Sequence, residues 1–281
     1  MFVGVTLVLV AVVGTAWLAP AGRGDVDSWS RAHGLRLTDG NRPMVGYYLR
    51  TARQLRGIGM VAGAVLPAFV VRAYGGGMPE MAALWGIAWA YVGYLVGSLY
   101  AELALARPGS SRRAASLEPR SLHAYLPRRH LWWQRAVAGG VVGGGALAAI
   151  LGPAPAVWVE GYGTGREPAA LLSVSAIVVA VVAEVLERWL IRRPQPLSRP
   201  DLVAADDAIR SQSVHSLCGS SLALLVLLAA AQAVVLAQRD LGDLRRPVFA
   251  AAAFGLFASY VTCMRFGHRA WRVQRAEGAV S

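Results

Sequence analysis

The stretch AEVLERWLIRRPQPLSRPDLVAADDAIRSQSVHSL, residues 183–217, decides the fold. An apolar run leads into it and another leads out of it, and between them lie five arginines, three aspartates and two Arg-Pro steps. The same arrangement of apolar run, arginine-rich loop and apolar run occurs twice earlier in the chain. Runs of about 18 or more apolar residues with few charges are typical of transmembrane helices. The sequence therefore predicts an all-α protein, a polytopic bundle of transmembrane helices.

The composition points to the same class. Of 281 residues, 56% are hydrophobic and 16% are charged, and the mean hydropathy is +0.45, whereas soluble domains carry roughly 25% charged residues. All 28 basic residues are arginine, which excludes every mechanism that needs a lysine, such as a Schiff base or a P-loop. The absence of lysine is typical of a genome rich in G+C. We therefore expect a multi-pass protein of a bacterial cell membrane.

Seven apolar spans are predicted within a single integral membrane domain, residues 1–281. They are residues 2–18, 57–74, 81–106, 136–158, 169–191, 214–238 and 248–264. The predicted connections on one side are the long loops 20–56, 107–135 and 188–213 and the tail 265–281. The connections on the other side are short and rich in glycine, so they have little room for a binding site.

The arginines predict the orientation of these spans. Twenty-three of the 28 lie in the three long loops and the tail, and five lie on the other side. Because arginines concentrate in cytoplasmic segments, the N-terminus is predicted outside and the C-terminus inside. An alternative for residues 2–18 is a cleaved signal peptide, but that run has no basic segment before it, and cleavage would leave a loop with seven arginines outside.

The cytoplasmic loops are expected to contain short amphipathic helices. Ser198-Arg-Pro-Asp201 is typical of a helix start, and Leu202, Ala205 and Ile209 then recur at helical spacing. Asn41-Arg42-Pro43 opens a similar stretch, and residues 120–126 form a third one that ends before Pro127. Such helices are expected on the inner membrane surface.

Small residues recur at helical spacing in three of the spans. This pattern favours close helix packing in a membrane, where burying apolar surface gives no drive for association. The bundle interior is the expected place for these faces, and a homodimer seam is the alternative. The residues are Gly59, Gly63, Gly86, Ala90, Gly93, Gly97, Gly139 and Gly143.

Two glutamates near the inner ends of spans are the candidate intramembrane ionisable groups. Glu102 and Glu184 each lie a turn or two from the predicted cytoplasmic interface, and an ionisable group at that depth is a functional hypothesis. A proton or cation relay is one reading. The other is an interfacial salt bridge, since Glu184 has Arg188 at i+4 and Glu187 beside it.

The loop before the sixth span supplies a second set of candidates, Asp201, Asp206, Asp207 and Arg210. Aspartates with an arginine could hold a divalent metal and a phosphate group, and a solvated helix face with ion pairs is the alternative. The five histidines have no i, i+4 pair, and the two cysteines, Cys218 and Cys263, have no CxxC spacing. The sequence therefore predicts no metal site, no cofactor and no catalytic motif.

Three functional hypotheses follow. The first is a non-enzymatic permease-like or accessory subunit that works with a partner membrane or cytoplasmic subunit. The second is a secondary transporter or channel, expected as a homodimer, that uses Glu102 and Glu184. The third is a lipid-directed enzyme that uses the Asp201–Asp207 loop. The net charge of +12 is expected to face anionic lipid at the inner membrane surface rather than nucleic acid.

Overall fold

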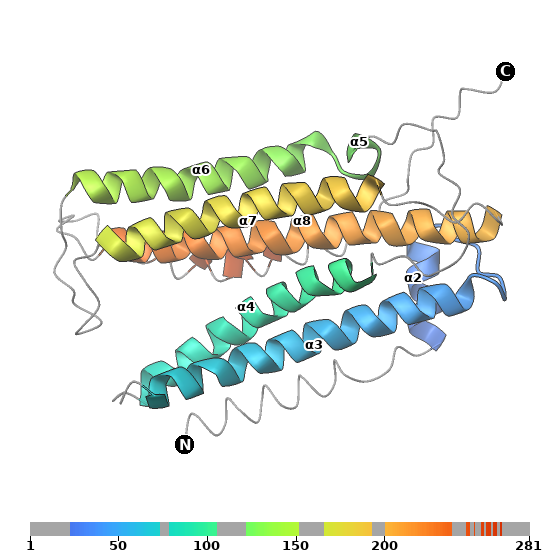
Figure 1. Cartoon of the computed structure of the whole chain (residues 1–281), viewed down its shortest axis with the longest axis horizontal. Helices are drawn as coiled ribbons and strands as arrows, with labels where there is room; N and C mark the ends of the chain where they lie inside the picture. Colours follow the sequence, from blue (N-terminus) through green and yellow to red (C-terminus); the bar gives the residue numbers. More distant parts are fainter. Residues whose placement is uncertain are drawn as a thin grey trace. The chain divides into compact units, whose positions relative to one another are not determined.

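The computed structural model shown in Figure 1 is all-helical in the part of the chain that it describes. That part comprises residues 23–73, 79–105, 122–151, 166–192 and 200–237, with positions 246–247, 250, 254–255, 257–259, 261–262 and 265. For residues 67–73, 79–88 and 166–168 the description covers the backbone only. The predicted span 2–18 lies outside the described residues, and so does most of the span 248–264. No strand occurs among the described residues.

The helices follow the order of the predicted spans. They are α2 (Arg23–Ala32), α3 (Arg42–Ala73), α4 (Pro79–Leu105), α5 (Leu122–Tyr125), α6 (Arg128–Ile150), α7 (Arg166–Arg192) and α8 (Pro200–Ala237). Two of them are long and apolar enough to cross a membrane, namely Ala169–Arg192 with a mean hydropathy of 2.5 and Pro200–Ala237 with 2.3. These two helices favour an association of the chain with a membrane.

Several helices extend well beyond the predicted spans. The predicted loop 20–56 contains α2 and the first turns of α3, which continue without a break into the span 57–74. The predicted loop 188–213 is mostly helix, because α7 reaches Arg192 and α8 begins at Pro200. The amphipathic segments expected at 41–55 and 201–215 are thus the first turns of the long helices α3 and α8.

The chain divides into two compact units, which we describe separately. Unit 1 comprises residues 1–125, 190–217 and 270–281, and unit 2 comprises residues 126–189 and 218–269. The helix α8 contributes its first half to unit 1 and its second half to unit 2.

The start of unit 1 is fixed by local backbone geometry. Helix α2 ends in a Schellman motif, in which Gly34 N–H donates to Arg31 O at 3.2 Å and Leu35 N–H donates to Ser30 O at 2.8 Å. Gly34 has a φ of 63°, which glycine adopts without steric cost. The turn leads the chain into the start of α3. The hydrophobic core of this part of unit 1 consists of Val26, Val45, Tyr48, Ala205 and Ile209.

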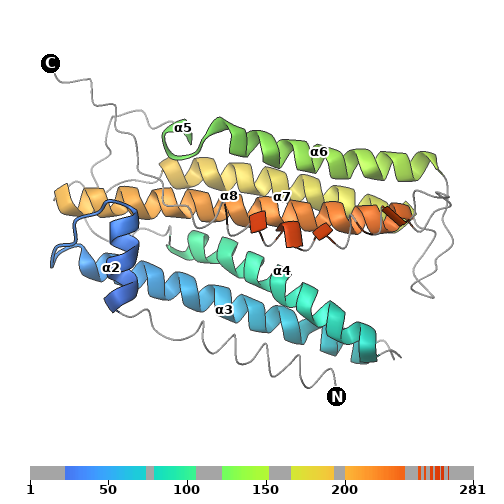
Figure 2. The ribbon, with the colours of Figure 1, turned by 180° about the vertical axis from the view of Figure 1, so that it is seen from behind.

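Helices α3 and α4 lie side by side in both ribbon views (Figures 1 and 2). Their contact is a seam of four glycines, Gly59 and Gly63 on α3 against Gly93 and Gly97 on α4. A Cβ added at Gly93 would lie 2.8 Å from Gly63 Cα, and one added at Gly63 would lie 2.9 Å from Gly93 Cα. No side chain fits between the two backbones here, so glycine is required on both helices.

Unit 2 packs α6, α7 and the second half of α8 around a small core. Ala138 and Val141 of α6 meet Ala176 of α7 and Leu225 of α8. Ser173 of α7 donates to Ala169 O at 2.9 Å, and a Cβ added at Gly145 would collide with that serine. The small residues of this core allow the three helices to approach closely.

Gly139 and Gly143 do not lie in the interior of the described bundle. An added Cβ at either position meets nothing within 4 Å, so neither glycine packs against a neighbour in the described part of the chain, and a homodimer seam at this face stays a prediction. In contrast, Ala90, which was expected on the same face as Gly93, is buried. The surroundings of Gly86 lie outside the described residues.

Candidate functional site

The first candidate, Glu102, lies in a buried polar cluster in unit 1. Its side chain is 1% exposed, and its Oε1 lies 3.3 Å from Arg56 Nη2. Tyr48 Oη donates to Glu102 Oε1 at 3.3 Å. Arg56 also donates to Ser216 Oγ at 2.7 Å. Three helices therefore contribute to the cluster, α3 with Tyr48 and Arg56, α4 with Glu102, and α8 with Ser216.

The glycine seam positions this ion pair. A Cβ added at Gly97 would lie 3.1 Å from Gly59 Cα and 3.3 Å from Arg56 Cα. The backbone of α4 thus approaches α3 at the turn that carries Arg56. Ser98 Oγ lies 3.2 Å from Ser216 Oγ and links α4 to α8 at the same level.

The charges of the cluster balance. Glu102 and Arg56 carry opposite formal charges and lie within ion-pair distance of each other, away from water. Burial, together with the nearby Glu102 carboxylate, raises the pKa of Tyr48 above its ordinary range, so Tyr48 stays protonated and acts as the donor. The cluster can hold three helices in register and contains a fixed pair of opposite charges.

The second candidate, Glu184, belongs to unit 2 and is partly exposed. Its Oε1 accepts a hydrogen bond from Arg135 Nε at 2.8 Å and is also bound by Arg135 Nη2. Its Oε2 lies 3.4 Å from Arg188 Nη2. The i+4 ion pair with Arg188 is therefore present, and Arg135 of α6 is an additional partner. Glu102 belongs to unit 1 and Glu184 to unit 2.

The four candidates of the predicted loop lie on α8 and have different partners. Asp206 and Arg210 form a buried pair at 2.6 Å. Arg210 also donates to the carbonyl oxygens of Leu190 and Ile191, at 3.2 and 2.8 Å, and so caps the C-terminal end of α7.

The other two aspartates point elsewhere. Asp201 accepts a hydrogen bond from Thr38 Oγ1 at 2.7 Å, and Asp207 accepts one from Tyr125 Oη at 3.3 Å. Among the described residues, no group of three or more histidine, cysteine, aspartate or glutamate side chains is placed to hold a metal ion. The expectation of a solvated face is wrong for Asp206 and Arg210, since both are buried.

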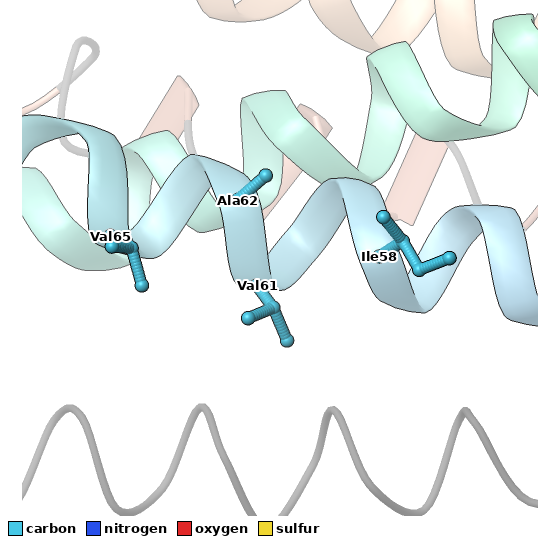
Figure 3. Close-up of a pocket in the computed structure, with 4 residues that line it drawn as sticks. All are labelled: Ile58, Val61, Ala62 and Val65. Atoms are coloured by element: carbon cyan, nitrogen blue, oxygen red, sulfur yellow. The ribbon is translucent and has the colours of Figure 1, made fainter.

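An apolar hollow lies on α3. Figure 3 shows its lining residues, Ile58, Val61, Ala62 and Val65, along successive turns of the helix. All four are apolar, so the described lining of the hollow offers no side-chain hydrogen-bonding or titratable group to a ligand. It is a surface for apolar contact.

Sequence reasoning missed the partners of Glu102 and a second buried cluster around Glu187. Arg56 was counted only as one of the charges that set the orientation. The signal for Ser216 and Ser221 was present in the run SQSVHSLCGSS at residues 211–221, in which polar residues interrupt an apolar helix. Ser98 and Glu102 also share one face of α4 at a spacing of four residues.

In comparisons with protein-family models, curated proteins and solved structures, the chain matches none.

Proposed function

We propose that this chain is a multi-pass integral protein of the cell membrane, with seven spans, an outer N-terminus and an inner C-terminus. Within the membrane it acts as a non-enzymatic, permease-like or accessory subunit for a partner protein. The polar groups at the inner ends of its helices hold the helices together, and the arginine-rich surface faces the cytoplasm.

The outward face of α7 is the observation that carries the membrane placement. Large apolar side chains are exposed along this helix for its whole length. They are Leu171, Val174, Ile177, Val178, Val181, Val182, Val185 and Trp189. Monomeric soluble proteins rarely expose an apolar patch of this extent, whereas a helix in contact with lipid requires one.

The inner end of unit 2 supports the same placement. Trp132 and Trp133 are exposed on α6 with ring centroids 4.9 Å apart. Arg128, Arg129 and Arg135 lie within a turn or so of them along the helix. Tryptophans favour the membrane interface, and arginines favour its anionic cytoplasmic side. This belt therefore fits the inner surface of the membrane.

The contacts of the acidic candidates support a non-enzymatic role. Glu102 is neutralised by Arg56, Asp206 by Arg210 and Glu184 by Arg135 and Arg188. Each of these pairs joins or stabilises helices. Each carboxylate is thus already engaged by an arginine, which supports a structural role for these pairs.

Cysteine accessibility tests the topology. Cys218 and Cys263 are first replaced by alanine, and then Ser111→Cys or Thr164→Cys is introduced. In intact cells, a membrane-impermeant maleimide is expected to label Thr164→Cys and to leave Ser111→Cys unlabelled until the cells are lysed. Labelling of Ser111→Cys in intact cells would contradict the proposed orientation.

Cross-linking in native cells tests the subunit role. The protein is then purified in mild detergent, and stoichiometric co-purification of a membrane or cytoplasmic protein is expected. Purification of the chain alone, or of a homo-oligomer, would rule out the accessory role. It would leave the transporter hypothesis, for which Glu102→Gln and Glu184→Gln are the variants to assay in proteoliposomes.

A lipid-directed enzyme has a direct test as well. The variants Asp207→Asn and Asp201→Asn replace carboxylates by amides of the same size that still have an acceptor oxygen for Tyr125 and Thr38, so the fold should tolerate them. Under the proposed function both variants keep their partner protein. Loss of a lipid-modifying activity in these variants would instead favour the enzyme.

A further inference from the structure

We propose that Glu187 of α7, together with Gln134 of α6 and Ser221 of α8, forms a proton-binding site in unit 2. The site is separate from the Arg56–Glu102 cluster and from the exposed Glu184 ion pairs. The inference does not depend on the accessory role, since it concerns which form of one carboxyl group the folded unit contains.

The geometry around Glu187 places a carboxyl group among neutral partners. Its side chain is fully buried. Its Oε1 accepts a hydrogen bond from Gln134 Nε2 at 2.9 Å, and the same amide nitrogen donates to Ser221 Oγ at 2.7 Å. Ser221 Oγ donates in turn to Cys218 O at 3.1 Å. Helices α6, α7 and α8 therefore each supply one side chain to the site, namely Gln134, Glu187 and Ser221.

The second oxygen of Glu187 is the notable atom. Among the residues that the structure describes, Oε2 is buried and has no hydrogen-bond partner. A buried acceptor without a donor is costly, and costlier still when it carries charge. A proton on Oε2 removes the charge and turns the acceptor into a donor.

The charges near Glu187 do not supply a counterion. On α7 the nearby charged groups are Glu184 and Arg188, and on α6 they are Arg135 and the buried His130, one turn before Gln134. Arg135 and Arg188 both bind the Glu184 carboxylate, and among the described residues neither of them forms an ion pair with Glu187.

On α8 the nearby titratable group is Cys218, which is buried. The neighbourhood of Glu187 thus favours the neutral carboxylic acid, in contrast to Glu102, whose charge is matched by Arg56.

Gln134 can accommodate both forms of the site. Its amide group has a donor end and an acceptor end, which a half-turn about its last side-chain bond exchanges. The donor end satisfies a carboxylate at Glu187, and the acceptor end satisfies a carboxylic acid. The proton binds to a carboxylate oxygen of Glu187 and is released to water, with no other bond broken. Glu184, three residues earlier on the same helix, is partly exposed.

Carbodiimide labelling of the full-length protein in its native membranes tests the inference. Dicyclohexylcarbodiimide reacts with protonated carboxyl groups in apolar surroundings and forms a stable N-acylurea, which mass spectrometry locates. Glu187 is expected to be labelled near neutral pH, and the labelling should decline as the pH is raised. Glu184 is the matched control, since it lies one turn away, is partly exposed and forms ion pairs with two arginines, and it should stay unlabelled.

Infrared spectroscopy gives an independent reading if the reagent cannot reach the site. The carbonyl band of a protonated carboxylic acid is expected in the wild type and in Glu184→Gln, and it should be lost in Glu187→Gln. Gln134→Ala removes the donor to the carboxylate, so labelling should persist to higher pH in that variant. Absence of the band from the wild type at neutral pH would overturn the inference, whatever the outcome of the topology and partner experiments.

Discussion

At the scale of single residues, the Arg56–Glu102 pair gives the sharpest stability prediction. Both charges are buried, so removal of one leaves the other without a counterion. Arg56→Met is expected to lower the free energy of unfolding by about 3–5 kcal/mol, because an unpaired buried charge is strongly unfavourable. Unfolding in mixed micelles, followed by circular dichroism, measures the effect.

The double variant Arg56→Met with Glu102→Leu is the control. Replacement of a buried ion pair by apolar residues of similar volume is often neutral, so this variant should recover most of the lost stability. If the losses of unfolding free energy in the two single variants instead add in the double variant, the two side chains are not coupled. The ion pair would then not stabilise the contact between α3 and α4.

His33 gives a prediction about pH. Its Nδ1 lies 2.9 Å from Trp29 O and its Nε2 lies 3.1 Å from Gln212 Oε1. Burial lowers the pKa of His33, and the two hydrogen bonds oppose that shift without cancelling it. Because the unfolded chain then takes up this proton first, stability is complete above an unfolded pKa of about 6.5 and falls as the pH decreases below it.

Thermal unfolding in detergent at pH of about 7.5 and about 5.5 measures this effect against the reference value for histidine. The wild type should lose more stability between these conditions than His33→Gln, which keeps a neutral polar side chain. His123→Gln is the matched control, since His123 is exposed, and it should behave as the wild type does. Equal pH dependence in wild type and His33→Gln would contradict the assignment.

The sequence identified Glu102 as a candidate ionisable group, but it did not identify Arg56 as its partner. Glu102 stands out because a charge interrupts an apolar span. Arg56 does not stand out, because it is the last of seven arginines in a loop and only the rotation of α3 against α4 brings it to Glu102. For the same reason Glu187 could not be separated from Glu184 by sequence. The two are three residues apart on one helix, and packing alone decides which of them is buried.

At the scale of helices, the glycine seam predicts opposite effects of the same substitution. Gly93→Ala places a Cβ 2.8 Å from Gly63 Cα, so α3 and α4 must separate, and overpacking of this kind costs about 1–3 kcal/mol. Gly143→Ala meets open space and gains up to about 1 kcal/mol of helix propensity. Unfolding of the two variants side by side in mixed micelles measures the difference, and equal stability would contradict the seam.

The seam also shows what helical patterns can predict. The same spacing of glycines occurs at Gly59 and Gly63 and at Gly139 and Gly143, yet within the described part of the chain the first pair contacts another helix and the second pair does not. Spacing indicates that a close approach is possible and does not identify a neighbour. Helix boundaries differ from the spans for a related reason. A span predicted from hydropathy ends where charged residues begin. The helix itself does not end there, because α8 continues from residue 200 to residue 237.

At the scale of the whole molecule, an arginine on the outward face of α7 tests the membrane placement. Val181 is exposed near the middle of that helix. In a bilayer, Val181→Arg is expected to cost about 2.5–3.5 kcal/mol of insertion free energy and to lower the amount of protein that resists alkaline extraction. Val181→Leu is the control and should leave that amount unchanged. If Val181→Arg is also without effect, the face is in contact with water or with another protein.

The outward face of α7 also has a length. From Leu171 to Trp189 it extends about 27 Å at the helical rise of about 1.5 Å per residue, slightly less than the hydrocarbon thickness of about 30 Å of a typical bilayer. Tilting shortens the projection of a helix on the membrane normal, so α7 cannot compensate for a thicker bilayer by tilting. The lipid around it must become thinner instead. Hydrophobic mismatch would thus favour thin bilayers and exclude this protein from thick, ordered lipid domains.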